Sequence, residues 1–265
     1  MAVNPVKFGA IEYLQAENIP VRHCFTTRIG GVGQGAAKGL NIGAHRDDFQ
    51  RVEENYALLG QALNFDPRCL VLGQQVHGNT IRMVTSRDAK GLDHLDYPAC
   101  DGLITNQPGV GLVVFTADCT PVLLWDSQTG AVGAVHAGWK GTALDICGEA
   151  VKAMATAYGC KPENIHAAIG PNIGACHFET DADVPEAILA AYGEKAREFI
   201  EKKGEKYFLD LKAINALGLR EAGVENIRLS SSCTACAPHR FWSHRVTGGK
   251  RGSQGAVILC QEVIR

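Results

Sequence analysis

The stretch "GAVGAVHAGWKG", residues 130–141, predicts a buried strand that ends on an imidazole. Its apolar run reaches His136, and small residues, a tryptophan and Lys140 follow at once. A short apolar run bounded by glycines is typical of a buried strand, and a glycine lets another group approach the backbone closely. The position of His136 therefore raises the question of what its side chain binds.

Two further stretches place polar side chains in the same context. "VLGQQVHGN" (71–79) runs from apolar residues into His77, and "VVFTADCTPVLL" (113–124) places Asp118 and Cys119 between two apolar runs. Any one of these residues alone is most simply a locally hydrogen-bonded group at the end of a strand. Their shared context favours a common site.

The composition is that of an ordinary globular protein. The chain has 265 residues, of which 46% are hydrophobic and 20% charged, and its formal net charge is -2. These values exclude a strongly basic surface for nucleic acid and give no support to a membrane role. We find neither a secretory signal nor an apolar stretch that spans a bilayer. We therefore expect a cytoplasmic protein whose ten cysteines are reduced thiols, most of them small core residues.

The order of predicted elements indicates an α+β fold with mixed sheets. Predicted strands cluster in the first half, and predicted helices are interspersed among strands later. Two strands at 68–76 and 79–86 are expected to form a hairpin with His77 at its corner. Other strands are expected at 100–106, 110–118, 121–127, 130–137 and 254–263, and helices at 47–64 and 142–159.

Two imidazoles and one thiolate, from His77, His136 and Cys119, form a suitable ligand set for zinc. Such a set leaves a fourth position open for water or substrate, and copper accepts the same donors. A metal there lowers the pKa of bound water and supplies a nucleophile. The competing interpretation is a metal-free cysteine hydrolase, in which His136 activates Cys119 and Asp118 orients the imidazole. The residues alone leave both interpretations open.

Several loops carry cations that suit an anionic ligand. Arg28, Lys140 and Arg245 follow glycine-rich or aromatic stretches, where cations beside free backbone N–H groups can bind phosphate. The "CTAC" motif (233–236) lacks a second C-x-x-C partner and does not open a helix, so we interpret it as loop structure. The "GGVGQG" stretch does not lie in a βαβ unit, which argues against a dinucleotide-binding domain.

With these residues in place, the chain resembles the YfiH family, also called the laccase-domain, multicopper polyphenol oxidase or peptidoglycan editing factor family. The motifs appear in the family's order over nearly the whole chain: "FTTRIGGV", "LNIG", "QQVHGN", "DGLIT", "ADCTPVLL", "AVHAGWKGT", "AIGPNIG" and "FWSHR". The resemblance implies one domain over 1–265 with four α/β/β/α layers, related to cysteine-hydrolase-like toxin domains. It also implies that His77, Cys119 and His136 bind a catalytic zinc, with copper as the older proposal.

The activity that the resemblance implies is that of a purine nucleoside phosphorylase and adenosine deaminase. Adenosine, inosine and S-methyl-5'-thioadenosine would react with phosphate to give free base and ribose 1-phosphate. Arg28, Lys140 and Arg245 are the expected phosphate-binding residues. Asp118 is the expected hydrogen-bond partner of a metal-bound histidine. The oligomeric state stays open.

Alternative functions are a copper oxidase, a cysteine hydrolase that edits peptidoglycan, and a metal-carrying accessory protein without enzymatic activity. The oxidase is physically weaker, because nine scattered histidines with no H-x-H pair do not build several copper sites. The chain also departs from the family pattern. Val246 and Thr247 replace an arginine–aspartate pair, Ser253 replaces a frequent arginine, and Asn172 replaces a common cysteine. These departures leave phosphate affinity and substrate choice open, and we assign Cys176 no site role.

Overall fold

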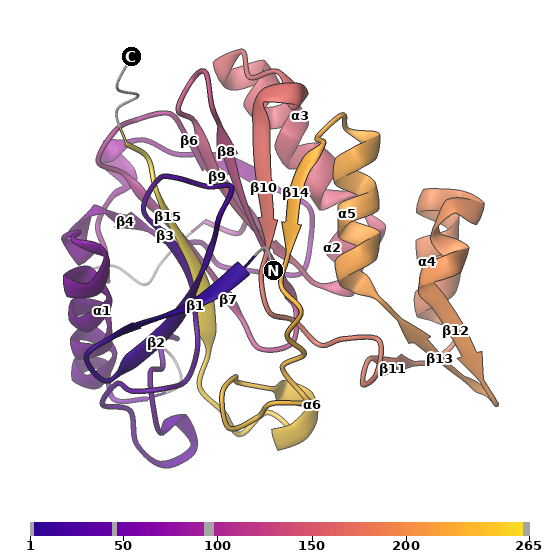
Figure 1. Ribbon diagram of the computed structural model, residues 1–265, viewed down its shortest axis with the longest axis horizontal. Helices are drawn as coiled ribbons and strands as arrows, with labels where there is room; N and C mark the ends of the chain where they lie inside the picture. The colour runs from indigo at the N-terminus through magenta and orange to yellow at the C-terminus, as the bar shows by residue number, and fades with distance from the viewer. Residues whose placement is uncertain (1–2, 44–46, 93–97, 262–265) are drawn as a thin grey trace.

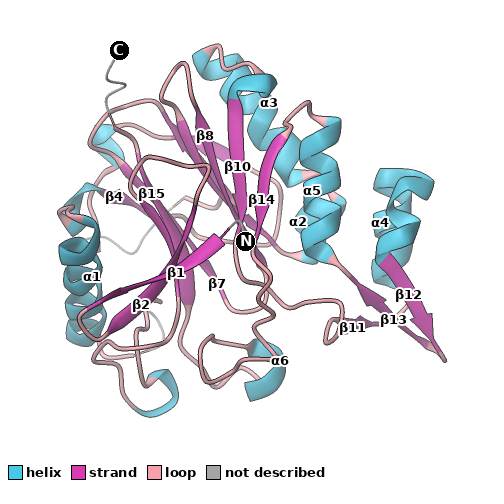
Figure 2. Cartoon of the chain, in the orientation of Figure 1, coloured by secondary structure: helices cyan, strands magenta, loops and turns pink. Residues whose placement is uncertain are grey.

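Two six-stranded sheets and one small three-stranded sheet form the frame of the protein (Figures 1 and 2). The structure is a computed structural model that describes residues 3–43, 47–92 and 98–261. The first sheet has the order β1 (Val3–Phe8), β2 (Ile11–Ala16), β3 (His23–Thr26), β15 (Gln254–Leu259), β7 (Gly111–Thr116) and β4 (Leu70–Val71). The second has the order β14 (Asn226–Leu229), β10 (Ile165–Ile169), β8 (Thr120–Asp126), β9 (Val132–Ala137), β6 (Gly102–Thr105) and β5 (Ile81–Met83).

The remaining elements are the small sheet and the helices. The small sheet has the order β11 (Glu179–Thr180), β13 (Lys206–Leu209) and β12 (Ile200–Lys203). The helices are α1 (Phe49–Leu63), α2 (Trp139–Ala143), α3 (Ile146–Tyr158), α4 (Asp183–Tyr192), α5 (Leu211–Glu221) and α6 (His244–Thr247). In the large sheets, β4 pairs parallel with β7, β5 with β6 and β10 with β14, whereas their other pairs are antiparallel. The prediction of mixed sheets is therefore confirmed.

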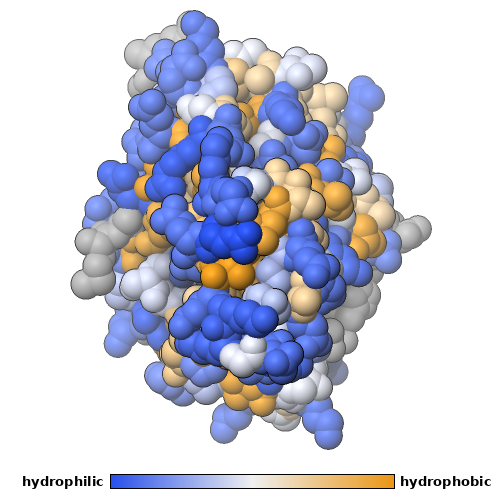
Figure 3. Space-filling model, turned by 90° about the vertical axis from the view of Figure 1, so that its right-hand side faces the viewer, coloured by the Kyte–Doolittle hydropathy of each residue, from blue (hydrophilic) through white to orange (hydrophobic). Residues whose placement is uncertain are grey.

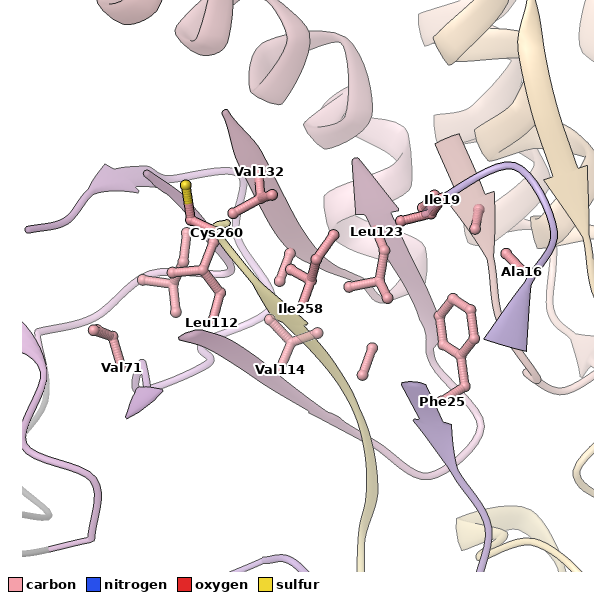
Figure 4. Close-up of a cluster of buried hydrophobic side chains, with 14 of the residues drawn as sticks. Ala16, Ile19, Phe25, Val71, Leu112, Val114, Leu123, Val132, Ile258 and Cys260 are labelled. Carbon is pink, nitrogen blue, oxygen red and sulfur yellow. The ribbon is translucent and has the colours of Figure 1, made fainter. Parts of the chain in front are cut away.

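The central strands are mostly apolar because each large sheet is covered on both faces. Side chains alternate between the faces, so Leu123 of β8 enters the core between the two sheets while Val122 and Leu124 face helices. Figure 4 shows part of the core between the sheets, with Phe25 and Ile258 from the first sheet and Leu123 from the second.

Helices cover the outer faces, so the layers run helix, sheet, sheet, helices (Figure 1). The apolar face of α1, with Tyr56 and Leu59, packs on the first sheet against Val113 and Val257. Side chains of α3 and α5 pack on the second sheet. Within the described ranges, no helix has both the length and the apolar character needed to cross a membrane.

The predicted helix at 47–64 is confirmed closely. Asp48 is the N-cap, and its side chain accepts a hydrogen bond from the backbone N–H of Gln50. The helix ends on Leu63, and the left-handed backbone of its C-cap Asn64 (φ 54°) terminates it. The predicted final strand runs only to Leu259, and the last two residues of its predicted range, 262 and 263, lie outside the described residues.

Two other element predictions were wrong. The stretches around 70 and 81 form no hairpin, because β4 joins the first sheet and β5 joins the second. The chain therefore crosses between the sheets at His77. The helix predicted at 142–159 is broken at Asp145, which has φ 51° and caps α3, and Leu144 is exposed rather than buried.

The small sheet and α4 lie at one end of the molecule (Figure 1). Ile188 and Tyr192 of α4 pack with Leu209 and Ile214 in a separate apolar cluster. Tyr192 also donates a hydrogen bond to the carbonyl of Thr142, which joins α4 to α2. Figure 3 shows this end, where hydrophilic side chains cover most of the face and hydrophobic ones lie between them.

Candidate metal centre

The structure brings His77, Cys119 and His136 together at the ends of the central strands. Their ligand atoms lie within 4.8 Å of one another. Cys119 Sγ is 3.9 Å from His77 Nε2, and the two imidazole rings meet edge to face at 4.9 Å between centroids. His77 is exposed and His136 is buried, so the cluster is open on one side.

His136 is fixed by a carboxylate that sequence reasoning missed. Its Nδ1 donates a hydrogen bond of 2.8 Å to Oδ1 of Asp101, a side chain with no exposed surface. The backbone N–H of His136 also donates to the carbonyl of Asp101, at 2.7 Å. A proton on Nδ1 leaves the Nε2 lone pair free to bind a metal, and such carboxylate partners are usual for metal-bound histidines.

The same carboxylate holds the loop that carries His77. The backbone N–H groups of Val76, His77 and Gly78 all donate to Asp101, at 2.8–3.1 Å. This contact explains the positive φ of His77 (62°), a conformation that three hydrogen bonds to one carboxylate stabilise. Burial would raise the pKa of Asp101, but hydrogen bonds from His136 and the loop outweigh it, so the pKa lies below its usual value.

Cys119 lies in the bend between β7 and β8, next to the cluster's histidines. Burial alone would raise the pKa of its thiol. The charge and hydrogen bond of His136, with a smaller contribution from His77, lower the pKa of Cys119 to about 6. Burial alone would lower the pKa of His136. The charge of the Cys119 thiolate outweighs this effect, and the pKa of His136 is raised to about 9. Each of the two groups therefore favours the charged form of the other.

Asp118 does not meet the expectation that it binds a metal-ligating histidine. Its Oδ1 accepts from the hydroxyl of Thr234 at 2.6 Å, and its Oδ2 accepts from Ser243 and from the backbone N–H of Arg245. Asp118 has a backbone φ of 89°. It therefore ties the Cys119 bend to the loops at 234 and 243–245, while Asp101 is the carboxylate beside His136.

The three ligands surround a space that suits a metal ion. A Cβ added to Gly138 would lie 2.8 Å from the His77 ring, 3.5 Å from Cys119 Sγ and 3.7 Å from the His136 ring. The donor set of two imidazoles and a low-pKa thiol fits zinc, with the fourth position open. The residues present therefore fit the group that the family implies.

The three expected phosphate ligands differ in their surroundings. Arg28 stacks over Trp242 at 4.0 Å and donates to the carbonyl of Pro238. Arg245 donates to the carbonyls of residues 177 and 179, and its backbone contacts Asp118. Lys140 is exposed on α2, which directly follows the strand that carries His136.

A cavity of about 440 Å³ begins at Asn79, two residues after His77, on the connection that leads to β5. It is lined by Ile81, Met83 and Ile104 on one side and by Lys152 and other residues of α3 on the other. None of the three candidate ligands lines this cavity, so we assign it no role in the chemistry of the candidate centre.

The fold and the cluster define a protein of mixed β-sheets and covering helices, with a histidine–cysteine site near its strand ends. A sequence profile described as Multi-copper polyphenol oxidoreductase laccase matches residues 22–261. The chain is 40% identical over 246 residues to a purine nucleoside phosphorylase of Deinococcus radiodurans, covering 92% of this chain and 91% of that one. It is 36% identical over 244 residues to the purine nucleoside phosphorylase YlmD of Bacillus subtilis, covering 90% and 88%.

Solved structures agree with these similarities. The crystal structure of the hypothetical protein YfiH of Bacillus licheniformis matches with a TM-score of 0.90 at 35% identity, covering 98% of this chain and 99% of that one. The chain therefore belongs to the YfiH, or laccase-domain, family, as its motifs predicted.

Proposed function

We propose that this protein is a zinc-dependent purine nucleoside phosphorylase that also deaminates adenosine. The substrates are adenosine, inosine or S-methyl-5'-thioadenosine with phosphate, and the products of phosphorolysis are the free base and ribose 1-phosphate. The observation that carries the proposal is the open cluster of His77, Cys119 and His136. The names of the Deinococcus and Bacillus relatives support the reaction class.

The residues divide into ligands, a positioning group and anion-binding candidates. When bound, zinc supplies a Lewis acid and a water of lowered pKa. Asp101 holds His136 with its Nε2 toward the cluster, and Gly138 leaves the space between the ligands open. We assign phosphate binding to Arg28, Lys140 and Arg245. Arg245 has N–H donors beyond those on its two carbonyl partners, since a guanidinium carries five.

The experiment combines metal content with turnover. Protein purified without chelator is analysed for zinc and copper by mass spectrometry, and the same sample is assayed with each nucleoside, with and without phosphate. We expect zinc and phosphate-dependent release of free base. Cys119→Ser should reduce turnover by about 100-fold or more, and Cys69→Ser is the matched control because Cys69 lies outside the candidate centre. Full phosphate-dependent turnover by Cys119→Ser would contradict the proposal.

A metal-free cysteine hydrolase is the second candidate function. Asp101, His136 and Cys119 form a chain of acid, base and nucleophile, and the lowered pKa of the thiol suits a nucleophile. A chelator separates the two functions. Wild-type protein stripped of metal should lose nucleoside turnover under our proposal, whereas a cysteine hydrolase should keep its amide hydrolysis and lose it to a thiol-alkylating reagent.

A further inference from the structure

A second cluster of metal-ligand side chains lies outside the candidate centre. Cys176 and His177 occupy a turn before β11, and Cys233 and Cys236 belong to the loop after β14. From the sequence alone, the "CTAC" motif was predicted to be loop structure and Cys176 to have no site role. The structure nevertheless places one ligand atom from each of the four residues within 4.8 Å of the others.

The distances match those of a tetrahedral metal site. Cys176 Sγ is 3.5 Å from Cys236 Sγ. His177 Nδ1 is 3.2 Å, 3.4 Å and 3.8 Å from the sulfurs of Cys176, Cys236 and Cys233. With zinc bonds of about 2.3 Å to sulfur and about 2.0 Å to nitrogen, a tetrahedron separates two sulfurs by roughly 3.8 Å and a sulfur from a nitrogen by roughly 3.5 Å. The four side chains can therefore bind one ion with small adjustments.

We propose that Cys176, His177, Cys233 and Cys236 form a structural zinc site. Three thiolates and one imidazole are a closed ligand set of the kind found in structural zinc sites, with no position left for substrate. The candidate centre differs in having three ligands and an open fourth position. Cys233 and Cys236 have the C-x-x-C spacing of zinc sites. The second pair of ligands is the adjacent Cys176 and His177, and not another C-x-x-C motif.

The surroundings of the cluster suit thiolates. The backbone N–H of Gly174 donates to Cys233 Sγ at 3.2 Å, a contact that favours the charged sulfur. The ammonium of Lys212 donates to the carbonyls of Ser230 and Ser232, which places a positive charge at the base of the loop. A zinc ion with three thiolates has a net charge of -1, which this cation offsets.

The site joins two loops that reach the candidate metal centre. Thr234, between the two loop cysteines, donates its hydroxyl hydrogen bond to Asp118, the neighbour of Cys119. The carbonyl of His177 accepts from the guanidinium of Arg245, whose backbone also contacts Asp118. A zinc ion here would hold both loops in place without touching substrate.

The first test uses the wild-type protein and does not depend on turnover. Cys176 and Cys236 are exposed, so as free thiols they should react rapidly with iodoacetamide. We expect site-resolved mass spectrometry to find both protected in protein purified with zinc and reactive after a chelator. Equal rapid labelling with and without chelator would overturn the proposal. Protection that a reductant removes and a chelator does not would show a Cys176–Cys236 disulfide, and would overturn it too.

The second test counts metal in variants. Wild-type protein should bind two equivalents of zinc, Cys236→Ser and Cys119→Ser one each, and the double variant none. The control Cys69→Ser should retain two. Cobalt bound to Cys119→Ser should show the visible absorption of a tetrahedral thiolate site. If Cys119→Ser binds no metal while remaining folded by circular dichroism, the second site does not exist, whatever the fate of the proposed activity.

Discussion

Asp101 is the residue on which the geometry of the candidate centre depends most. One buried carboxylate fixes the ring of His136 and, through three backbone N–H groups, the loop of His77. A buried carboxylate is stable only when its oxygens accept hydrogen bonds. Those of Asp101 accept them from the His136 ring and from the loop that carries His77. The two histidines are therefore positioned together rather than independently.

Asp101→Asn should weaken zinc binding at the candidate centre by about 10- to 100-fold, because an amide cannot accept all of these hydrogen bonds. Competition with a chromophoric chelator measures the affinity, in the Cys236→Ser background so that one site is counted. Asp126→Asn is the matched control, since Asp126 is equally buried and accepts from the backbone of Gln128 and Thr129. Equal losses in both variants would contradict a specific role for Asp101.

His23 should make stability depend on pH. Its Nε2 accepts from the backbone N–H of Ala16, its Nδ1 donates to the carbonyl of Val21, and burial lowers its pKa below the ordinary 6.5. As pH falls below 6.5, His23 becomes protonated in the unfolded chain but stays neutral in the native protein. The free energy of unfolding therefore decreases until the pH reaches the lowered pKa of the native state. The slope is at most about 1.4 kcal/mol per pH unit.

Urea denaturation at several pH values from 7.5 to 5 measures this effect. His23→Gln should show a smaller loss of unfolding free energy over that range than the wild type. An identical pH dependence in the two proteins would remove His23 as its source.

At the scale of elements, the candidate centre is built where strands end. Cys119 directly precedes β8, and His136 pairs with Pro121 in the β8–β9 ladder. The two adjacent strands therefore place two of the ligands at the same end of the second sheet. The third ligand arrives on the connection that crosses between the sheets. Gly138, the N-cap of α2, lets this helix begin directly beside the three ligands.

Gly138→Ala should abolish zinc binding at the candidate centre while leaving stability nearly unchanged. The backbone φ of -69° is one that alanine adopts freely, so the effect comes from the Cβ that would fill the space between the ligands. Metal analysis in the Cys236→Ser background and thermal melts give the two readouts. Gly133→Ala, in the same strand region but with ordinary contacts of 3.4 Å, should keep the metal. Retention of zinc by Gly138→Ala would show that the ligands are not held as described.

At the scale of the whole molecule, stability depends on the core between the two large sheets. Leu123, fully buried, lies in that core beside side chains of the opposite sheet (Figure 4). Because both faces of this strand are covered, neighbouring side chains cannot move in to fill the space left by a truncated side chain, and a cavity remains. The sheets also carry the loops that meet at the candidate centre.

Leu123→Ala should lower the free energy of unfolding by about 2–5 kcal/mol, through lost burial and the cavity left behind. Leu144→Ala is the control, because Leu144 is 53% exposed and its truncation should change stability by less than about 0.5 kcal/mol. Denaturant titrations measure both. Similar losses in the two variants would mean that the interface between the sheets is not the main core.

The sequence by itself determined the local features of this protein. Apolar runs predicted the central strands, helical spacing predicted the helix at 47–64, and the shared context of the three ligands predicted a site before its geometry was known. Such features depend on neighbouring residues, whose spacing and capping chemistry can be recognised along the chain. The family resemblance came from the same short motifs.

Only the tertiary structure decided which distant residues meet. Asp101 lies 35 residues before His136, and Cys176 lies 60 residues before Cys236, yet each pair is in contact. The connection at His77 looked like a hairpin, because local turn signals do not tell which sheet a strand joins. Pairing of distant strands depends on burial and hydrogen bonding across the whole fold, and no local pattern records it.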